Sequence, residues 1–394
     1  MSFELLFLIV LAGLFGPLLS GNRRFTLPLV VGEIIAGIAI GKSGFAWVDP
    51  AEPLFAFLSS VGFAFLLFLV GVKLPLRDPG LRSALKSASL ATFLSFALAV
   101  PFGFGLAYLS HVPNVGLFIL LCACSSTSTV VPILLERNLN GRTIVLTTAW
   151  IAMADVASMV ALPLVMATGN TRSVVLGAVL VTLAAVGCFV GMKFFRLSKT
   201  GERLRALSKE KHWALDLRLS LGMLFGLAWL ATKFGTSVLV AGFAAGMVAS
   251  LVGHPRRFYK QLIGLGEGFL VPLFFVHLGA SIDVSELFSS FWQVGLALSI
   301  ALSAMLVHVL AARFAKLPIA SGLSASAQMG LPAALVSMAL ANGLLTPGQG
   351  ASLIAAALLS LLTCSLGVKL LATCPGVEQG KGHKAEEDSE DSES

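Results

Sequence analysis

The amino-acid sequence predicts an all-α polytopic membrane protein, and three properties of the chain support this fold class. Of its 394 residues, 57% are hydrophobic and only 12% are charged, whereas a soluble globular domain carries about 25% charged residues. The mean hydropathy is +0.91. Apolar runs long enough to cross a hydrocarbon core roughly 30 Å thick recur along almost the whole chain. Water-facing domains cannot be built from this composition.

The composition also argues against several kinds of site and partner. The five cysteines are an odd number without metal-ligand spacing, so no disulfide framework and no metal centre is expected. The 27 basic residues exceed the 20 acidic ones, but they lie in short loops and indicate membrane orientation, not nucleic-acid binding. Neither an HExxH zinc motif nor a GxSxG nucleophile elbow occurs in the sequence, so we expect no enzyme and no cofactor.

Charged and Pro/Gly-rich breaks divide the chain into thirteen predicted transmembrane helices. They lie near residues 2–20, 26–41, 54–75, 81–110, 115–135, 143–168, 173–195, 214–232, 236–252, 265–281, 288–312, 318–343 and 347–371. The first has no basic flank and no small-residue cleavage site, so we interpret it as a span and not as a signal peptide. Long continuous apolar runs also argue against a membrane β-barrel.

The loops between these helices test the predicted number. Odd-numbered loops with their flanks and the C-terminal tail hold 24 Lys and Arg residues, whereas even-numbered loops hold only Lys42, Arg172 and Lys233. Because cytoplasmic loops are rich in Lys and Arg, this division predicts an external N-terminus and a cytoplasmic C-terminus in a cell membrane.

Thirteen helices divide as six, one and six, which predicts an inverted repeat of the kind found in secondary transporters. Gly37 in VVGEIIAGIAIG matches Gly246 in VLVAGFAAGMVAS at an offset of 209. Gly71 in LFLVGVKL matches Gly279 in FVHLGASI at an offset of 208. Two nearly equal offsets favour a repeat over the chance recurrence of small-residue packing motifs.

Asp155 is the clearest candidate for an ion-binding residue. It lies near the middle of TIVLTTAWIAMADVASMVALPLV, with no basic residue close to it on the same span. A charge at this depth costs at least about 2.5–3.5 kcal/mol, so the carboxylate is expected to face a cavity or the interior of a helix bundle. The alternative is a neutral Asp held by hydrogen bonds to a neighbouring helix.

The span before Asp155 contains a run of five hydroxyl residues followed by Pro132. The run consists of Ser125, Ser126, Thr127, Ser128 and Thr129. Ser and Thr compete for backbone hydrogen bonds and proline removes a helical donor, so a broken helix is predicted. Its hydroxyls and released carbonyls could bind an alkali cation, and ordinary Ser/Thr packing between helices is the alternative.

The twelfth span has a corresponding interruption at Gln328, Gly330 and Pro332. Two interrupted helices at matching positions of the two halves predict a binding site near the bilayer midplane. Three more intramembrane residues are possible accessory titratable groups, namely His277, His308 and Glu33. For the histidines the alternative is a neutral hydrogen-bonded side chain, and for Glu33 it is a packing or interfacial role.

These motifs together resemble the monovalent cation:proton antiporter-2 family, which includes sodium/hydrogen exchangers and Kef-type potassium efflux proteins. The resemblance covers residues 1–372 through LPLVVGEIIAGIAIGKSG, LLFLVGVKLPL, SSTSTVVPILLERN, AMADVASMVALPL, VPLFFVHLGASIDV and SAQMGLPAALVS, in that family's order. It implies a homodimer in the lipid bilayer and a membrane domain at 1–375. Spans 1–3 and 8–10 would form a fixed interface part, span 7 a linker, and spans 4–6 and 11–13 a mobile core.

The resemblance also implies a mechanism, in which the mobile core carries the ion by elevator-type alternating access. Two crossed breaks at 125–129 and 328–332 would lie beside Asp155, which matches the family's ion- and proton-binding aspartate. The residue before that aspartate is usually Asp, Gln or Asn in the family, and here it is Ala154. With one carboxylate, the expected exchange is one cation for one proton, and therefore electroneutral.

Two further departures concern regulation and charge compensation. Several relatives pair the aspartate with a Lys or Arg on the eleventh span, where this chain has only His308 and, nearer the end, Arg313. No nucleotide-binding regulatory domain is seen after the membrane domain, so Kef-type ligand gating is not expected. Residues 376–394 hold seven acidic residues against two lysines, and we expect them to form a disordered cytoplasmic tail.

The function predicted from the sequence is thus antiport of Na+ or K+ against H+, with Asp155 as the shared carrier. Two alternatives remain open. One is a transport-inactive, antiporter-like scaffold or sensor, and the other is an organic-anion symporter on a related scaffold.

Overall fold

A computed structural model describes residues 3–20, 29–73, 79–166, 171–234, 238–253 and 256–379 of the chain. The N-terminal helices are α1 (Phe3–Gly13), α2 (Phe15–Ser20), α3 (Leu29–Ile40), α4 (Pro53–Lys73), α5 (Pro79–Ser110), α6 (Val115–Ala123) and α7 (Thr127–Glu136). The central elements are β1 (Leu139–Asn140), α8 (Arg142–Val165), α9 (Thr171–Leu197), α10 (Lys199–Glu210), α11 (Leu215–Lys233), α12 (Val238–Val252) and α13 (Arg256–Leu265). The C-terminal elements are the π-helix η1 (Gly266–Leu270), α14 (Val271–Ser281), α15 (Val284–Ser289), α16 (Phe291–Phe314), α17 (Ile319–Ala325), α18 (Gly330–Ala341), α19 (Pro347–Leu371) and β2 (Glu378–Gln379).

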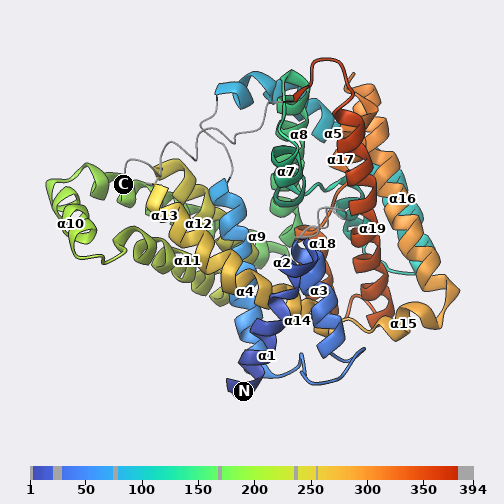
Figure 1. Cartoon of the computed structure of the whole chain (residues 1–394), viewed down its shortest axis with the longest axis horizontal. Helices are drawn as coiled ribbons and strands as arrows, with labels where there is room; N and C mark the ends of the chain where they lie inside the picture. The colour runs from blue at the N-terminus through green and yellow to red at the C-terminus, as the bar shows by residue number, and fades with distance from the viewer. Residues whose placement is uncertain are drawn as a thin grey trace.

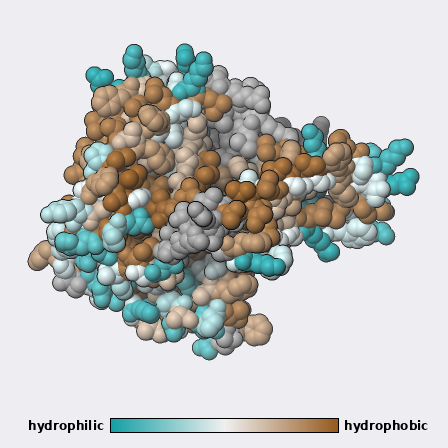
Figure 2. Space-filling view, turned by 180° about the vertical axis from the view of Figure 1, so that it is seen from behind, coloured by the Kyte–Doolittle hydropathy of each residue, from teal (hydrophilic) through white to brown (hydrophobic). Residues whose placement is uncertain are grey.

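The predicted all-α membrane architecture is confirmed. Within the described ranges, nine helices are long and apolar enough to cross a membrane, and shorter apolar helices cover Phe3–Leu18, Leu29–Ile40 and Val240–Val252. Each predicted span lies on one helix or on consecutive helices. Hydrophobic residues cover much of the face in Figure 2, and hydrophilic residues gather at its margins and at the tip of a projecting arm. This distribution is typical of a membrane protein whose apolar surface faces lipid and whose polar ends face water.

The helices pack as two groups. The first helix group consists of α1–α4, α9, α11–α14 and η1, and the second helix group consists of α5–α8 and α15–α19. Figure 1 shows much of the second group (α5, α8, α16, α17 and α19) on the right, and α10 at the left edge. The main contacts between the groups run through α8, which touches α9 and α12.

Glycines allow the helices of the first group to approach each other closely. A Cβ atom on Gly37 of α3 would lie 3.0 Å from the Cα of Gly279 on α14. A Cβ atom on Gly71 of α4 would lie 2.9 Å from the Cα of Gly246 on α12. Small residues of this kind let backbones meet in the absence of a hydrophobic driving force between helices. Both pairs of helices are therefore fixed by backbone packing.

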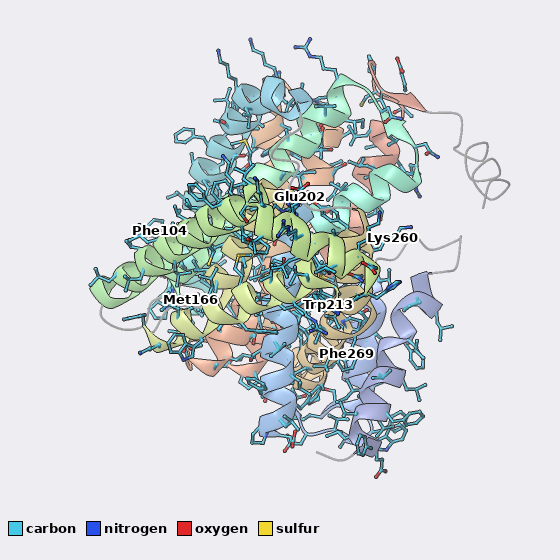
Figure 3. The ribbon with its side chains drawn as sticks, turned by 90° about the vertical axis from the view of Figure 1, so that its left-hand side faces the viewer. Phe104, Met166, Glu202, Trp213, Lys260 and Phe269 are labelled. Atoms are coloured by element: carbon cyan, nitrogen blue, oxygen red, sulfur yellow. The ribbon has the colours of Figure 1, made fainter. Side chains whose placement is uncertain are left out.

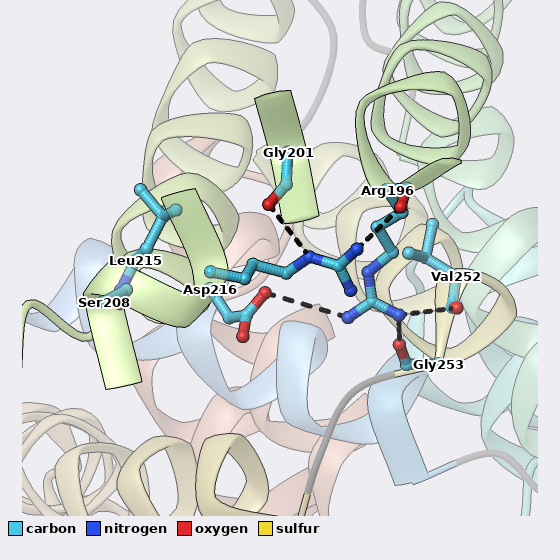
Figure 4. A network of polar contacts seen from close by, with 8 residues as sticks. Arg196, Gly201, Ser208, Leu215, Asp216, Val252 and Gly253 are labelled. Atoms are coloured by element: carbon cyan, nitrogen blue, oxygen red, sulfur yellow. Dashed lines mark hydrogen bonds and ion pairs between the residues drawn. The ribbon is translucent and has the colours of Figure 1, made fainter. Parts of the chain in front are cut away.

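The arm at the left of Figure 1 is anchored by a polar network at the end of α9. Arg196 lies 3.7 Å from Asp216 of α11 and donates to the carbonyls of Val252 and Gly253 after α12. Arg205 of α10 donates to the Arg196 carbonyl at 2.6 Å (Figure 4). The network joins α9, α10, α11 and α12, because arginine can serve several acceptors at once. Figure 3 looks onto this arm, with Glu202 on α10 and Lys260 on α13.

Two helices are interrupted, as predicted, but the breaks lie at different residues from those expected. The first break spans 124–126, between α6 and α7, so Thr127 and Thr129 are helical instead of lying in the break at 125–129. The second spans 326–329, between α17 and α18, and not 328–332. Pro332 is the third residue of α18. The first N–H groups of a helix have no acceptor within the helix, so a proline is tolerated there. Pro332 and Thr127 thus stand at helix starts, whereas Ser125 and Ser126 lie inside the first gap.

A short strand pair occurs at one end of the second helix group. Leu139 pairs with Gln379 and Asn140 with Glu378 in an antiparallel arrangement. Disorder was expected from residue 376, but these backbone hydrogen bonds extend the ordered chain to 379. Residues 380–394 of the predicted acidic tail lie outside the described residues.

Candidate functional site

The two breaks face each other inside the second helix group. Ser125, in the first break, donates its hydroxyl hydrogen to the carbonyl of Ala325 at the end of α17, at 2.6 Å. Gln328, in the second break, donates its side-chain amide to the carbonyl of Leu121 on α6. Each break therefore supplies a side chain that satisfies backbone released near the other one, as buried backbone groups require.

The side chain of Asp155, a residue of α8, lies against the N-terminal end of α7, directly beyond the first break. The backbone N–H of Thr127, the first residue of α7, donates to Asp155 Oδ2 at 2.9 Å. The Asp155 side chain comes from the middle of α8 and is 4% exposed. A helix N-terminus carries partial positive charge, so α7 stabilises the carboxylate that it faces. The structure thus brings together the hydroxyl run and Asp155, as expected from the sequence.

The second half-helix also begins against α8. Gly330, the first residue of α18, lies next to Met159, which is one turn from Asp155 on α8. Both α7 and α18 therefore direct their N-terminal ends toward the same part of α8. Half-helix N-termini that point at an anionic group are a recurrent way of placing charge at membrane depth.

The hydroxyl run serves several different purposes. Ser126 and Thr129 pair with each other at 3.0 Å, and Ser125 holds Ala325. The Thr127 side chain lies beside the Asp155 carboxylate, and its buried hydroxyl makes no hydrogen bond of normal geometry to a residue that the structure describes. The side chain of Ser128 lies outside the described part. Of these candidates, Thr127 has the hydroxyl best placed to bind a cation at Asp155.

Several polar residues of the site were not identified from the sequence. Ser158 follows Asp155 by three residues on α8, is fully buried, and has a hydroxyl without a described partner. Ser360 of α19 accepts the Gln328 N–H at 3.0 Å, and Thr147 of α8 donates to Ser321 of α17 at 2.8 Å. Isolated serines in apolar helices look like ordinary packing residues, so only the spacing of Ser158 from Asp155 could have indicated it.

His308 is part of the same site, whereas the other two accessory candidates are not. His308 on α16 is fully buried, and its Nε2 lies 3.2 Å from Ser125 Oγ. His277 on α14 donates from Nε2 to the carbonyl of Pro50 at 3.0 Å, which ties α14 to the loop before α4. Glu33 is buried on α3, which packs against α1, α2 and α14. Glu33 and His277 therefore belong to the first helix group.

The electrostatics of the site follow from how few charged groups are buried. Among the described residues, the buried acidic, basic and histidine side chains are Glu33, Asp155 and His308. No described group of three His, Cys, Asp or Glu side chains could hold a metal ion. A buried carboxylate needs a countercharge, which a proton or a bound cation can provide. The site can therefore bind one or the other at Asp155.

Comparison with known proteins places the chain among ion exchangers. The family model described as "Sodium/hydrogen exchanger, transmembrane" matches residues 7–374. The chain is 27% identical over 304 residues to the Na+/H+-K+ antiporter GerN of Bacillus cereus, covering 75% of this chain and 76% of GerN. It is 28% identical over 300 residues to YjbQ of Bacillus subtilis, covering 72% of this chain but only 48% of YjbQ. The chain thus spans about half the length of that relative.

A solved structure shares the fold. The sodium proton antiporter MjNhaP1 from Methanocaldococcus jannaschii superposes with a TM-score of 0.63 at 19% sequence identity. The superposition covers 95% of this chain and 97% of MjNhaP1. At that identity the match establishes the fold of the chain.

Proposed function

Because the chain belongs to the family of transmembrane sodium/hydrogen exchangers, we propose that it is a secondary antiporter exchanging Na+ or K+ for H+ across a cell membrane. The observation that carries this proposal is the place of Asp155, a buried carboxylate at the N-terminus of a half-helix between two helix breaks. The family is one of transporters, in agreement with the exclusion of an enzyme from the sequence. No cofactor is needed beyond the transported ions.

Asp155 is the proposed shared carrier. The Thr127 N–H supports its charged form, but apolar surroundings make a bare charge costly, so the carboxylate binds either a cation or a proton. The hydroxyls of Thr127 and Ser158 would complete the cation shell. Its neighbour Ala154 has no group to take up a second proton, so one cation replaces one proton and the exchange is electroneutral.

The glycine contacts support the proposed inverted repeat of thirteen spans. In the sequence, Gly37 matches Gly246 and Gly71 matches Gly279. If the two halves are repeats, the contact between Gly37 and Gly279 in one pair of helices should therefore have a counterpart between Gly246 and Gly71. Both contacts exist. In addition, a Cβ on any of these four glycines would meet the carbonyl three residues before the facing glycine. The same register in both contacts is what a repeat would produce, and it supports the proposal.

The packing supports the proposed elevator. The second helix group contains both breaks and Asp155 and corresponds to the mobile core, while the first helix group corresponds to the fixed interface part of a homodimer. The two groups meet mainly where α8 touches α12 and α9, so one can slide past the other at modest cost. Arg196 ties α9 to α11 and α12, so the linker would stay with the fixed part. The proposed orientation has the N-terminus outside and the C-terminus in the cytoplasm.

The decisive experiment measures cation-driven proton flux in proteoliposomes with Na+, K+, Li+ and organic anions added in turn. We expect Asp155→Asn to fold normally and to lose all cation-dependent flux, because an amide binds neither ion. Asp216→Asn, which removes a carboxylate from the α9–α11 network, serves as the matched control and should retain flux. Normal flux in Asp155→Asn would contradict the proposal. Absence of flux in the unaltered protein would favour a scaffold or sensor, and flux driven only by organic anions would favour a symporter.

A further inference from the structure

His308 lies where three elements of the site meet. Its ring packs against Trp150 of α8, with 5.8 Å between the ring centroids. Gly322 of α17 lies directly over its backbone, since a Cβ there would be 2.6 Å from the His308 carbonyl oxygen. Ser125 of the first break approaches the ring from a third side. The imidazole is therefore fixed among α8, α16, α17 and the first break.

Three backbone carbonyls surround His308 and Ser125. His308 Nδ1 lies 2.9 Å from the carbonyl of Ala304, the carbonyl of Ala123 faces the ring, and the Ser125 hydroxyl donates to the carbonyl of Ala325. Ala123 ends α6 and Ala325 ends α17, so both of these carbonyls stand at helix ends created by the breaks. The Ala304 carbonyl also accepts the backbone N–H of His308 within α16, whereas the carbonyls of Ala123 and Ala325 have lost their helical donors. Carbonyls only accept hydrogen bonds, so Nδ1 must carry a hydrogen to bond to Ala304.

A count of hydrogens shows what the arrangement requires. The one N–H of a neutral histidine is needed at Nδ1, which faces the Ala304 carbonyl. The single hydrogen of the Ser125 hydroxyl goes to the Ala325 carbonyl, so Nε2, 3.2 Å from Ser125 Oγ, must carry a second N–H to bond to that oxygen. A protonated histidine carries both of these N–H groups. Protonation of His308 also places positive charge at the C-terminal end of α6, where a helix has partial negative charge. Both considerations favour the imidazolium, and both act against the cost of burying its charge.

The same break is held from its other side by Asp155. In a continuous helix the Thr127 N–H would bond to the Ala123 carbonyl, but here it donates to Asp155 while the Ala123 carbonyl faces His308. We propose that His308 binds a proton and acts as a positioning residue, which holds the end of α6 and Ser125 while Asp155 holds the start of α7. Loss of that proton would let the Ser125 hydroxyl turn from Ala325 to Nε2, which would release the end of α17. Only the transport measurement described below depends on the proposed antiport function; the proton on His308 does not.

The other ionisable groups around His308 do not provide this function. The helices packed on α16 are α5, α6, α15, α17 and α19, and α8 touches the ring. Their buried titratable groups are the thiols Cys122, Cys124 and Cys364 and the Asp155 carboxylate. The charged side chains of Lys86, Glu286, Arg313 and Lys369 on these elements are exposed. Within the described part of the chain, His308 is the one buried side chain here that can become positive.

The transport test compares His308→Gln with His277→Gln in proteoliposomes, at values between about pH 5 and about pH 8. The glutamine amide retains hydrogen bonding but does not titrate. We expect the pH profile of His308→Gln to lose one transition, with a maximal rate within roughly tenfold of the unaltered protein. His277→Gln should keep the original profile. A profile of His308→Gln that superimposes on the original would overturn the proposal, even if the rate fell.

A second measurement does not depend on transport. The histidine Cε1–H resonance of His308, assigned by its absence in His308→Gln, should titrate in the detergent-solubilised protein over the same pH range, and a resonance that stays constant would overturn the proposal. Should His308→Gln fail to fold, Ser125→Ala replaces it, because loss of the hydroxyl should alter the same transition of the pH profile. An unchanged profile in Ser125→Ala would also count against the proposal. Retained flux in Asp155→Asn would instead contradict the proposed function.

Discussion

The two helix groups bury their backbones in different ways. In the first group, continuous helices meet at glycines, and Gly37, Gly71, Gly246 and Gly279 bring backbone against backbone. In the second group, two helices are broken, and side chains such as Ser125, Gln328 and Asp155 satisfy the released backbone groups. Glycine contacts allow little movement, because a gap of about 0.5–1 Å already forfeits a quarter to a half of the dispersion attraction. Hydrogen bonds from a side chain can be exchanged between partners, which agrees with the proposal that the second group is the mobile one.

Substitution of the facing glycines should give the largest effect on stability. Gly279→Ala places a methyl group against the backbone of α3, and we expect the free energy of unfolding to fall by about 1–3 kcal/mol. Gly222→Ala is the matched control, because nothing lies within 4 Å of a Cβ at that position, and it should be neutral or stabilise α11 by about 0.5–1 kcal/mol. Thermal unfolding in detergent measures both. Equal effects at the two positions would show that close glycine packing does not distinguish the first group.

The hydroxyl of Thr127 should matter for transport and not for stability. Thr127→Val keeps the shape of the side chain and removes a hydroxyl that bonds to no described residue, so the unfolding temperature should hardly change. If the hydroxyl binds the cation, the KM for Na+ or K+ should rise roughly tenfold, which corresponds to about 1.4 kcal/mol. Thr92→Val on α5 removes another buried hydroxyl without a described partner and should leave the KM as it is. Similar KM values for the two variants would argue against Thr127 as a ligand.

Loss of Arg196 should give the smallest of these effects and should be confined to the first group. Arg196→Gln removes the ion pair with Asp216 and the bonds to the carbonyls after α12. Because the pair is partly exposed, with side chains 20% and 25% accessible, we expect a loss of about 1 kcal/mol. Thermal unfolding at low and high salt gives the measurement, and the difference between the variant and the unaltered protein should shrink at high salt. A change in the pH profile of transport would mean that α9 moves with the second group instead.

Hydropathy was sufficient to locate the apolar helices, because it is a local property of the sequence. The same approach could not find α10, α13 and α15. Of these, α10 and α15 begin with the side-chain caps Ser198 and Asp283. Gly and Pro near Gln328 indicated an interruption, but its limits depend on which backbone groups find partners on other helices. A sequence does not show those partners.

The site was predictable only in part, for a related reason. Asp155 was identified because a charge inside an apolar run is costly wherever the helix packs. The contact between Ser125 and His308 joins residues 183 positions apart. The Ser158 hydroxyl, which has no described hydrogen-bond partner, can be interpreted only from its neighbours in space. His277, His308 and Glu33 could not be separated by their sequence surroundings, since the difference between them lies in which helix group they enter.

The strand pair β1–β2 provides a place to observe the proposed elevator. It fastens the chain at residues 378–379 to the loop between α7 and α8, so this point is part of the second helix group without lying in any of its helices. A spin label or fluorophore at Glu378, paired with one at Lys260 on α13, would act as a ruler between the two groups. The separation of the two labels should shorten or lengthen as Na+ replaces H+, so the motion could be recorded in single molecules.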